Sequence, residues 1–240
     1  MHRIDDFADE RNKSWCIHCT RWLTAVETNE DHVPSQSLLR KPHPHHLPKV
    51  TVCKKCNSDF SKDEQYLVAF LSSVLAGSTK PTVQGNASAA RALARSPKLR
   101  ERIAQSSTAY RTLGGDTRII WKPETGRIRR VILKNARGHA YFELGEPMLD
   151  EPTSVWMHPL ESLTKSERQE FESLPGAGEQ ALWPEVGSRM LTRLVTGEDM
   201  SGLWVIVQDR VYRYAVSQRA GILVRSVLSE YLATEVYWDV

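Results

Sequence analysis

Two cysteine pairs with the spacing Cys-x-x-Cys constrain this chain more than any other feature. The pairs are Cys16 with Cys19 and Cys53 with Cys56, and they account for all four cysteines of the 240 residues. Each pair can turn two thiolates toward one ion, and four thiolates form a closed tetrahedral zinc site. A redox motif or unpaired structural thiols are the alternatives, but a redox motif needs no second pair. The spacing therefore predicts a structural Zn²⁺ that staples a loop-rich N-terminal segment.

Composition indicates an ordinary folded protein, since 40% of the residues are hydrophobic and 25% are charged. No run approaches the ~18 apolar residues that cross a bilayer. The N-terminal sequence MHRIDDFADERNKSW has acids where a signal peptide needs an apolar core. We therefore expect a cytoplasmic protein with no membrane partner, and reduced thiols in that compartment also disfavour disulfides.

The pattern of apolar residues predicts an α+β chain in two parts. Residues 1–77 would form a zinc-bound module with a strand over 50–53 and a helix over 57–77, which Ser61 and Glu64 could cap. Residues 78–240 would form an accessory α+β domain with an antiparallel sheet. Its expected helices are 86–105 (broken at Pro97), 160–173 and 185–196, and its expected strands are 117–123, 126–135, 139–145, 202–208, 210–216, 222–228 and 234–240.

The net charge of +3 permits binding to nucleic acid without requiring it. Residues 118–139 hold seven Lys or Arg residues against one acid, Glu124. This stretch could be a solvated strand face that is balanced by the acidic residues of 143–172. It could also be a surface that contacts phosphates. The sequence leaves both interpretations open.

Three polar residues beside the cysteines have the chemistry of a hydrolytic site. Asp31 and His32 are adjacent in the stretch EDHVPS, and Asn57 directly follows Cys56. Carboxylate and amide oxygens suit Mg²⁺ or Mn²⁺ better than they suit zinc. An imidazole next to them can take a proton from water. A closed four-thiolate zinc site has no open position for water, so any catalysis must come from residues such as these.

Taken together, the segments CIHC, EDHVP and CKKCN resemble the HNH, or ββα-metal, endonucleases, in the subgroup with a four-cysteine zinc. The resemblance covers about residues 14–66. It implies a His general base at His32 and one catalytic Mg²⁺ or Mn²⁺ held by Asp31 and Asn57. It implies nucleic acid, above all double-stranded DNA, as the substrate. Its other implied site residues are the zinc ligands Cys16, Cys19, Cys53 and Cys56 and the phosphate-contacting Lys54, Lys55 and Lys62.

The chain departs from that family at one position. Many members carry an Asn near the start of the second strand, where it helps to orient the His, but residues 33–52 contain no Asn. Either the backbone alone supports His32, or Gln36, His45 or His46 substitutes. The prolines around His43, His45 and His46 favour a solvated loop over a second metal site.

Two functions are compatible with these observations. The first is a metal-dependent endonuclease that hydrolyses phosphodiester bonds. The second is a zinc-knuckle module that binds nucleic acid or protein without catalysis. Residues 78–240 would select the target or partner, including a second copy of the chain, and no motif in them names a ligand.

Overall fold

The computed structural model describes residues 11–173, 188–218 and 221–239, and it has the predicted α+β class with antiparallel sheets. The helices are α1 (Lys54–Ala76), α2 (Ala87–Arg95), α3 (Pro97–Gln105), α4 (Thr125–Leu144), α5 (Lys165–Ser173) and α6 (Arg189–Thr196). The strands are β1 (Thr28–His32), β2 (Lys49–Cys53), β3 (Ser107–Arg111), β4 (Thr117–Trp121), β5 (Ser154–Pro159), β6 (Met200–Ser201), β7 (Trp204–Gln208), β8 (Tyr212–Gln218), β9 (Ile222–Leu228) and β10 (Leu232–Trp238). Among the described helices, none is long and apolar enough to span a bilayer.

The chain forms two compact units, and each is described by itself. One unit comprises residues 1–57 and 132–240, and the other comprises residues 58–131. The boundaries fall inside α1 and α4, so a helix runs from one unit into the other at both junctions. The predicted division at residue 77 is one of function, between a nuclease module and an accessory domain. It stays a prediction.

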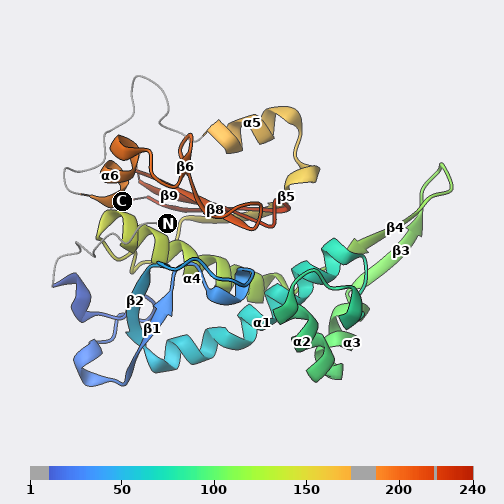
Figure 1. The fold of residues 1–240 in the computed structure, drawn as a ribbon, viewed down its shortest axis with the longest axis horizontal. Helices are drawn as coiled ribbons and strands as arrows, with labels where there is room; N and C mark the ends of the chain where they lie inside the picture. Colours follow the sequence, from blue (N-terminus) through green and yellow to red (C-terminus); the bar gives the residue numbers. More distant parts are fainter. Residues whose placement is uncertain (1–10, 174–187, 219–220, 240) are drawn as a thin grey trace. The chain divides into compact units, whose positions relative to one another are not determined.

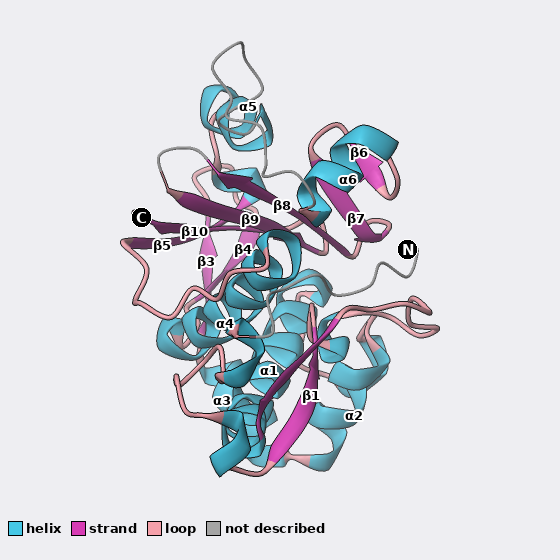
Figure 2. Ribbon diagram, turned by 90° about the vertical axis from the view of Figure 1, so that its left-hand side faces the viewer, coloured by secondary structure: helices cyan, strands magenta, loops and turns pink. Residues whose placement is uncertain are grey.

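A six-stranded antiparallel sheet dominates the first unit, in the order β5-β10-β9-β8-β7-β6. Helix α5 lies over one face and the second half of α4 lies over the other (Figure 2). Phe171 of α5 packs with Trp204, Ala215 and Val227 of the sheet. The C-terminal strands were predicted correctly, although residue 240 lies outside the described residues, as do 185–187 of the predicted 185–196 helix. Of the aromatic residues in and beside these strands, Trp204, Tyr212, Tyr214 and Trp238 are buried, whereas Tyr231 and Tyr237 are half-buried.

Helix α4 corrects the sequence analysis most strongly. Residues 126–135 and 139–145 were predicted as strands, but both lie almost wholly in this helix. Its second half is buried on nearly every side, from Val131 to Tyr141. A helix buried all round has no polar face to mark a 3.6-residue period, so its run of Val, Ile and Leu resembles a strand. The predicted strand at 117–123 is present as β4, but it pairs with the preceding β3.

The second unit contains most of α1, the helices α2 and α3, and a hairpin of β3 and β4 that extends away from α2 and α3 (Figure 1). The side chain of Asn86 caps α2, and Ser96 caps α3. Pro97 therefore begins a new helix, as predicted. The expected cap at Ser61 is wrong, because β2 runs directly into α1 at Lys54 and Ser61 lies inside the helix.

Candidate functional site

A hairpin, a loop and a helix converge in the N-terminal part of the first unit. Strands β1 and β2 pair antiparallel from Thr28 opposite Cys53 to His32 opposite Lys49. The loop with the first cysteine pair precedes β1, and the stacked rings of Trp15 and Trp22 close it, with centroids 4.0 Å apart. The second cysteine pair lies where β2 passes into α1. The first cysteine pair, in the loop before β1, therefore lies next to the second pair, at the junction of β2 and α1.

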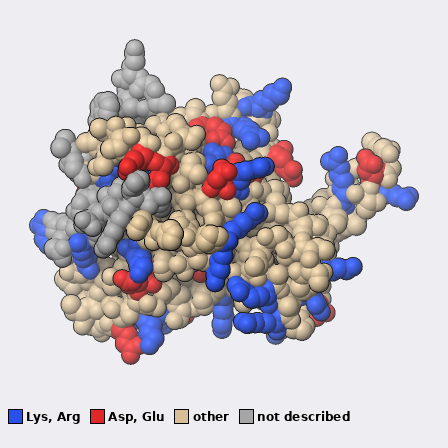
Figure 3. Space-filling view, in the orientation of Figure 1, with Lys and Arg blue, Asp and Glu red and all other residues tan. Residues whose placement is uncertain are grey.

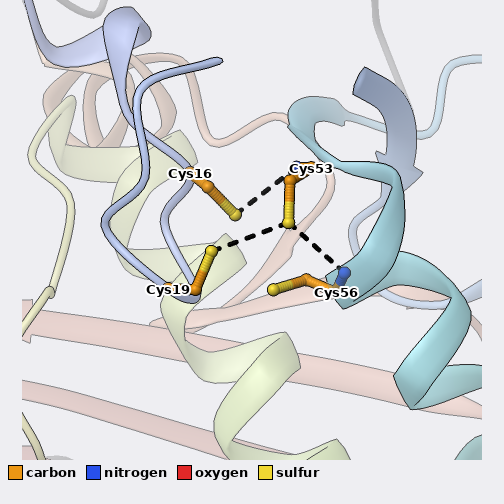
Figure 4. Close-up of side chains that lie close together, drawn as sticks. All are labelled: Cys16, Cys19, Cys53 and Cys56. Atoms are coloured by element: carbon orange, nitrogen blue, oxygen red, sulfur yellow. Dashed lines mark hydrogen bonds between the residues drawn. The ribbon is translucent and has the colours of Figure 1, made fainter. Parts of the chain in front are cut away.

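The four cysteine sulfurs face one another between that loop and the start of α1 (Figure 4). Their sulfur atoms all lie within 4.8 Å of one another, and those of Cys19 and Cys53 are 3.6 Å apart. Tetrahedral coordination with metal–sulfur bonds of about 2.3 Å places sulfurs about 3.8 Å apart. All four cysteines are free of disulfides. The cluster therefore fits a metal ion with four thiolate ligands.

Hydrogen bonds within the cluster shift the pKa values of its thiols in opposite directions. The pKa of Cys16 is lowered, chiefly because the Cys56 side chain hydrogen-bonds to it, and the same interaction raises the pKa of Cys56. The backbone amide of Cys53 donates to the Cys16 sulfur at 3.4 Å, and that of Cys56 donates to the Cys53 sulfur at 3.3 Å. These donors favour thiolates, and four adjacent thiolates would repel one another unless a positive ion lay between them.

Asp31 faces α4 at the end of β1, where it is buried. Lys134 Nζ donates to Asp31 Oδ1 at 2.7 Å and to the Ser35 hydroxyl at 2.8 Å. His18 Nε2 lies 3.7 Å from the second carboxylate oxygen of Asp31. Burial raises the pKa of Asp31, but His18 and Lys134 outweigh it, so the pKa is lowered overall. The carboxylate is therefore ionised and already paired with a buried ammonium.

The expected divalent ion does not fit this arrangement, although the donor types suit it. One oxygen of Asp31 is bonded to Lys134, and only 7% of the residue is exposed. Asn57 lies in the first turn of α1, and its amide nitrogen reaches the backbone oxygen of Glu30 at 3.5 Å. Among the described residues, the contacts of the Asp31 carboxylate are with Lys134 and His18. Binding of Mg²⁺ or Mn²⁺ there would require Lys134 to withdraw.

His32 is the last residue of β1, and its side chain points to the opposite face from Asp31 because successive strand residues alternate. It is half-buried, unlike Asp31. Burial lowers the pKa of His32 and the Lys49 charge lowers it further, while Asp31 and Glu30 oppose them; the pKa is lowered overall. The imidazole is therefore neutral near neutral pH and able to accept a proton.

The three lysines proposed to contact phosphates are all exposed. Lys54 is held by Glu27, with its Nζ 2.8 Å from a carboxylate oxygen, so it is partly neutralised. Lys62 lies in the second unit, where its backbone oxygen accepts a hydrogen bond from Arg127. Of the three loop histidines, His45 and His46 are exposed and His43 is half-buried, and the described residues contain no group of three metal-type side chains besides the cysteines.

Lys134 and Asn135 are the residues that the sequence analysis missed. Asn135 accepts hydrogen bonds from the backbone amide and the hydroxyl of Ser35, at 2.9 and 3.3 Å. An asparagine thus holds the turn after His32, but it comes from α4 instead of residues 33–52. The sequence pattern places Lys134 in a predicted strand, 126–135, and leaves open whether that basic stretch contacts phosphates. The sequence pattern did not reveal that these residues lie in a helix. The helix turns the side chains of both Lys134 and Asn135 toward the hairpin.

No family model, curated protein or solved structure matches the chain. Assignment to the HNH endonucleases therefore depends on the residues of the N-terminal segment alone.

Proposed function

We propose that the chain is an HNH-type endonuclease that hydrolyses phosphodiester bonds in nucleic acid, with double-stranded DNA as the substrate. One observation carries the proposal: a strand ending in His32 pairs with a second strand that leads into a helix bearing Asn57, and a four-cysteine cluster joins them. This order of elements agrees with the resemblance of CIHC, EDHVP and CKKCN to that family. In the proposal, the ion in the cysteine cluster is a structural Zn²⁺.

The chemistry would start at the half-buried face of β1. A neutral His32 takes a proton from water, the resulting hydroxide attacks phosphorus, and the bond to the 3′-oxygen breaks; the departing 3′-oxygen then takes a proton from solvent water. The lowered pKa of His32 keeps its base form available at neutral pH. Lys54 and Lys55 on the first turn of α1 would bind the phosphate backbone.

A catalytic Mg²⁺ or Mn²⁺ on Asp31 and Asn57 is part of the family's chemistry. The contact between Asp31 and Lys134 stands against it in the form described here. The steps at His32 do not involve this ion, and a comparison of nicking across divalent metals tests whether cutting depends on it.

Plasmid nicking by the wild-type protein and by His32→Ala tests the proposal. Loss of a positioned general base should slow cutting by about 10²- to 10⁴-fold. The control is His46→Ala, because His46 is an exposed loop histidine between the same cysteine pairs. Zinc content should be unchanged in both variants. Equal nicking by the wild type and His32→Ala, or no nicking by either across divalent metals, would refute the catalytic proposal.

The rival function, a zinc-knuckle module that binds without catalysis, has support from the same site. A buried carboxylate that is paired with a lysine is a structural arrangement as much as a catalytic one. Under this hypothesis, neither the wild type nor His32→Ala would cut DNA, and both would bind it equally. Nucleic-acid binding with no cutting under any metal condition would favour it.

A further inference from the structure

The hairpin of β3 and β4 is exposed on both of its faces. Four of the five residues of each strand are exposed, and the half-buried ones, Ser107 and Trp121, lie opposite each other at its base. A two-stranded hairpin without a covering layer is marginally stable in water. This one nevertheless carries large exposed apolar side chains, namely Tyr110, Leu113, Ile119 and Ile120. Such a hairpin is typical of an arm that contacts a partner.

The register of the hairpin shows what each face presents. Opposed residues share a face, and faces alternate along a strand. One face therefore holds Tyr110 opposite Arg118, with Ile120 two residues along. The other face holds Arg111 opposite Thr117, with Ile119 two residues along. Each face thus combines one guanidinium with an apolar surface.

The charge of the second unit indicates the chemistry of the partner. Residues 58–131 contain 13 Lys or Arg and six Asp or Glu, a net charge of +7, whereas the whole chain has +3. Within this unit the described ion pairs involve Arg102, Arg127 and Arg130. Arg111, Arg118 and Lys122 of the hairpin have no carboxylate partner among the described residues. Figure 3 shows basic side chains on the projecting hairpin, together with an acidic side chain near its tip.

We propose that this hairpin is a DNA-binding arm that enters the major groove of double-stranded DNA. The major groove is about 12 Å wide and admits a two-stranded ribbon whose strands are about 4.8 Å apart. Arg111, Arg118 and Lys122 bind phosphates and base edges, and the apolar side chains lie against sugars and thymine methyl groups. Double-stranded RNA is excluded because its major groove is too narrow.

Charge also disfavours a second copy of the chain on this surface. The copy would bring its own Arg111 and Arg118 to the same surface, where like charges repel. The inference depends on the proposed function only in its choice of nucleic acid as partner. It assigns binding to a hairpin outside the segment that resembles the nucleases.

Binding of a fluorescent 20-base-pair duplex, without added divalent ions and with the duplex checked for cleavage after the measurement, tests the arm. Arg111→Ala/Arg118→Ala should weaken binding at least 10-fold and reduce the slope of log K against log salt by about 2, because each lost phosphate contact contributes about 0.9. The control is Lys165→Ala/Arg168→Ala, which removes the same charge from exposed positions of α5. Circular dichroism and zinc content should match the wild type in both.

Three outcomes would overturn the inference: equal effects of the two double substitutions, wild-type binding to duplex RNA as tight as to duplex DNA, or a loss of self-association without a loss of DNA binding. Failure of the proposed function would look different. In that case, DNA binding would depend on Arg111 and Arg118 although neither the wild type nor His32→Ala cuts DNA.

Discussion

At the scale of single residues, the pair of Asp31 and Lys134 joins two side chains that are 103 positions apart and almost fully buried. Removing both charges from water is costly, and their mutual attraction offsets that cost only while both partners are present. The pair therefore holds the end of β1 against α4 as long as neither side chain is lost.

Lys134→Met should destabilise the protein by about 3–5 kcal/mol, because it leaves an unpaired carboxylate in a buried site. Asp31→Asn/Lys134→Met should recover most of the loss. Urea unfolding of the three proteins measures these differences. Lys49→Met is the matched control, since its partner Glu30 is exposed, and its cost should stay below about 1 kcal/mol. If Lys134→Met costs no more than Lys49→Met, the pair is not structural.

His139 makes the stability of the protein depend on pH. It is buried between α4 and the sheet, where it stacks on Tyr214 and hydrogen-bonds to the Tyr212 hydroxyl at 3.0 Å. Burial, with a contribution from Arg193, lowers the pKa of His139 to about 3. Below the unfolded pKa of about 6.5, the unfolded chain binds a proton that the folded protein does not. Stability that is fully present above pH 6.5 is therefore lost as the pH falls toward 3.

The loss should be about 1.4 kcal/mol per pH unit, or about 2 kcal/mol at pH 5. His139→Gln cannot titrate, so its free energy of unfolding should fall less steeply between pH 7 and pH 5, whatever its value at pH 7. His46→Gln changes an exposed histidine and should keep the wild-type slope. Parallel curves for the wild type and His139→Gln would contradict the assignment.

At the scale of elements, α4 is the centre of the first unit, since its second half packs against the β1–β2 hairpin and against the six-stranded sheet. Gly138 allows the close approach to the hairpin. A methyl group at this position would lie 2.7 Å from one Val33 methyl and 3.0 Å from the other. Tyr141, one turn further along, packs against Ile17, Val50 and Val52.

Gly138→Ala should destabilise the protein by about 1–3 kcal/mol, because overpacking pushes the hairpin off α4. Val33→Ala/Gly138→Ala should show favourable coupling, because the smaller side chain makes room. Thermal unfolding of the single and double variants measures both effects. Gly126→Ala, in the same helix with nothing near the added methyl, should be neutral or slightly stabilising. A Gly138→Ala protein as stable as Gly126→Ala would refute the steric argument.

The elements also show how far sequence patterns reach. The cysteine spacing correctly indicated a four-thiol cluster, because the two cysteines of each pair are only three positions apart and local geometry turns them toward each other. Helix α1, the break at Pro97 and the C-terminal strands could be predicted from the period of their apolar residues and from the positions of Gly and Pro. Helix α4 did not, since it is buried on both sides. With α4 assigned to strands, no local signal could bring Lys134 to Asp31 or Asn135 to Ser35.

At the scale of the whole molecule, the four-cysteine cluster belongs to one unit only. Residues 58–131 contain no cysteine, whereas the other unit contains all four. A small apolar cluster around Ile17 and Val52 is the packing that supports the cysteine loop. Loops with so little core depend on the metal for their stability.

Removal of the metal by a chelator, or Cys19→Ser, should therefore loosen residues 11–57 first. Limited proteolysis of the full chain should cut there before it cuts in residues 58–131, and the loaded protein should contain about one zinc per chain. Ser61→Ala, in an exposed part of α1, is the control and should leave both zinc content and cleavage pattern unchanged. A metal-free protein with the cleavage pattern of the loaded one would show that the cluster is dispensable.

The discontinuous first unit also has a consequence for synthesis on the ribosome. Asp31 emerges about 100 residues before its partner Lys134, a delay of roughly 5–20 s at ordinary elongation rates. During that interval the cysteine loop and hairpin have no α4 to pack against, because residues 58–131 are still being synthesised. Metal capture by the nascent thiols would then be the event that protects the N-terminal segment until translation delivers the helix that completes it.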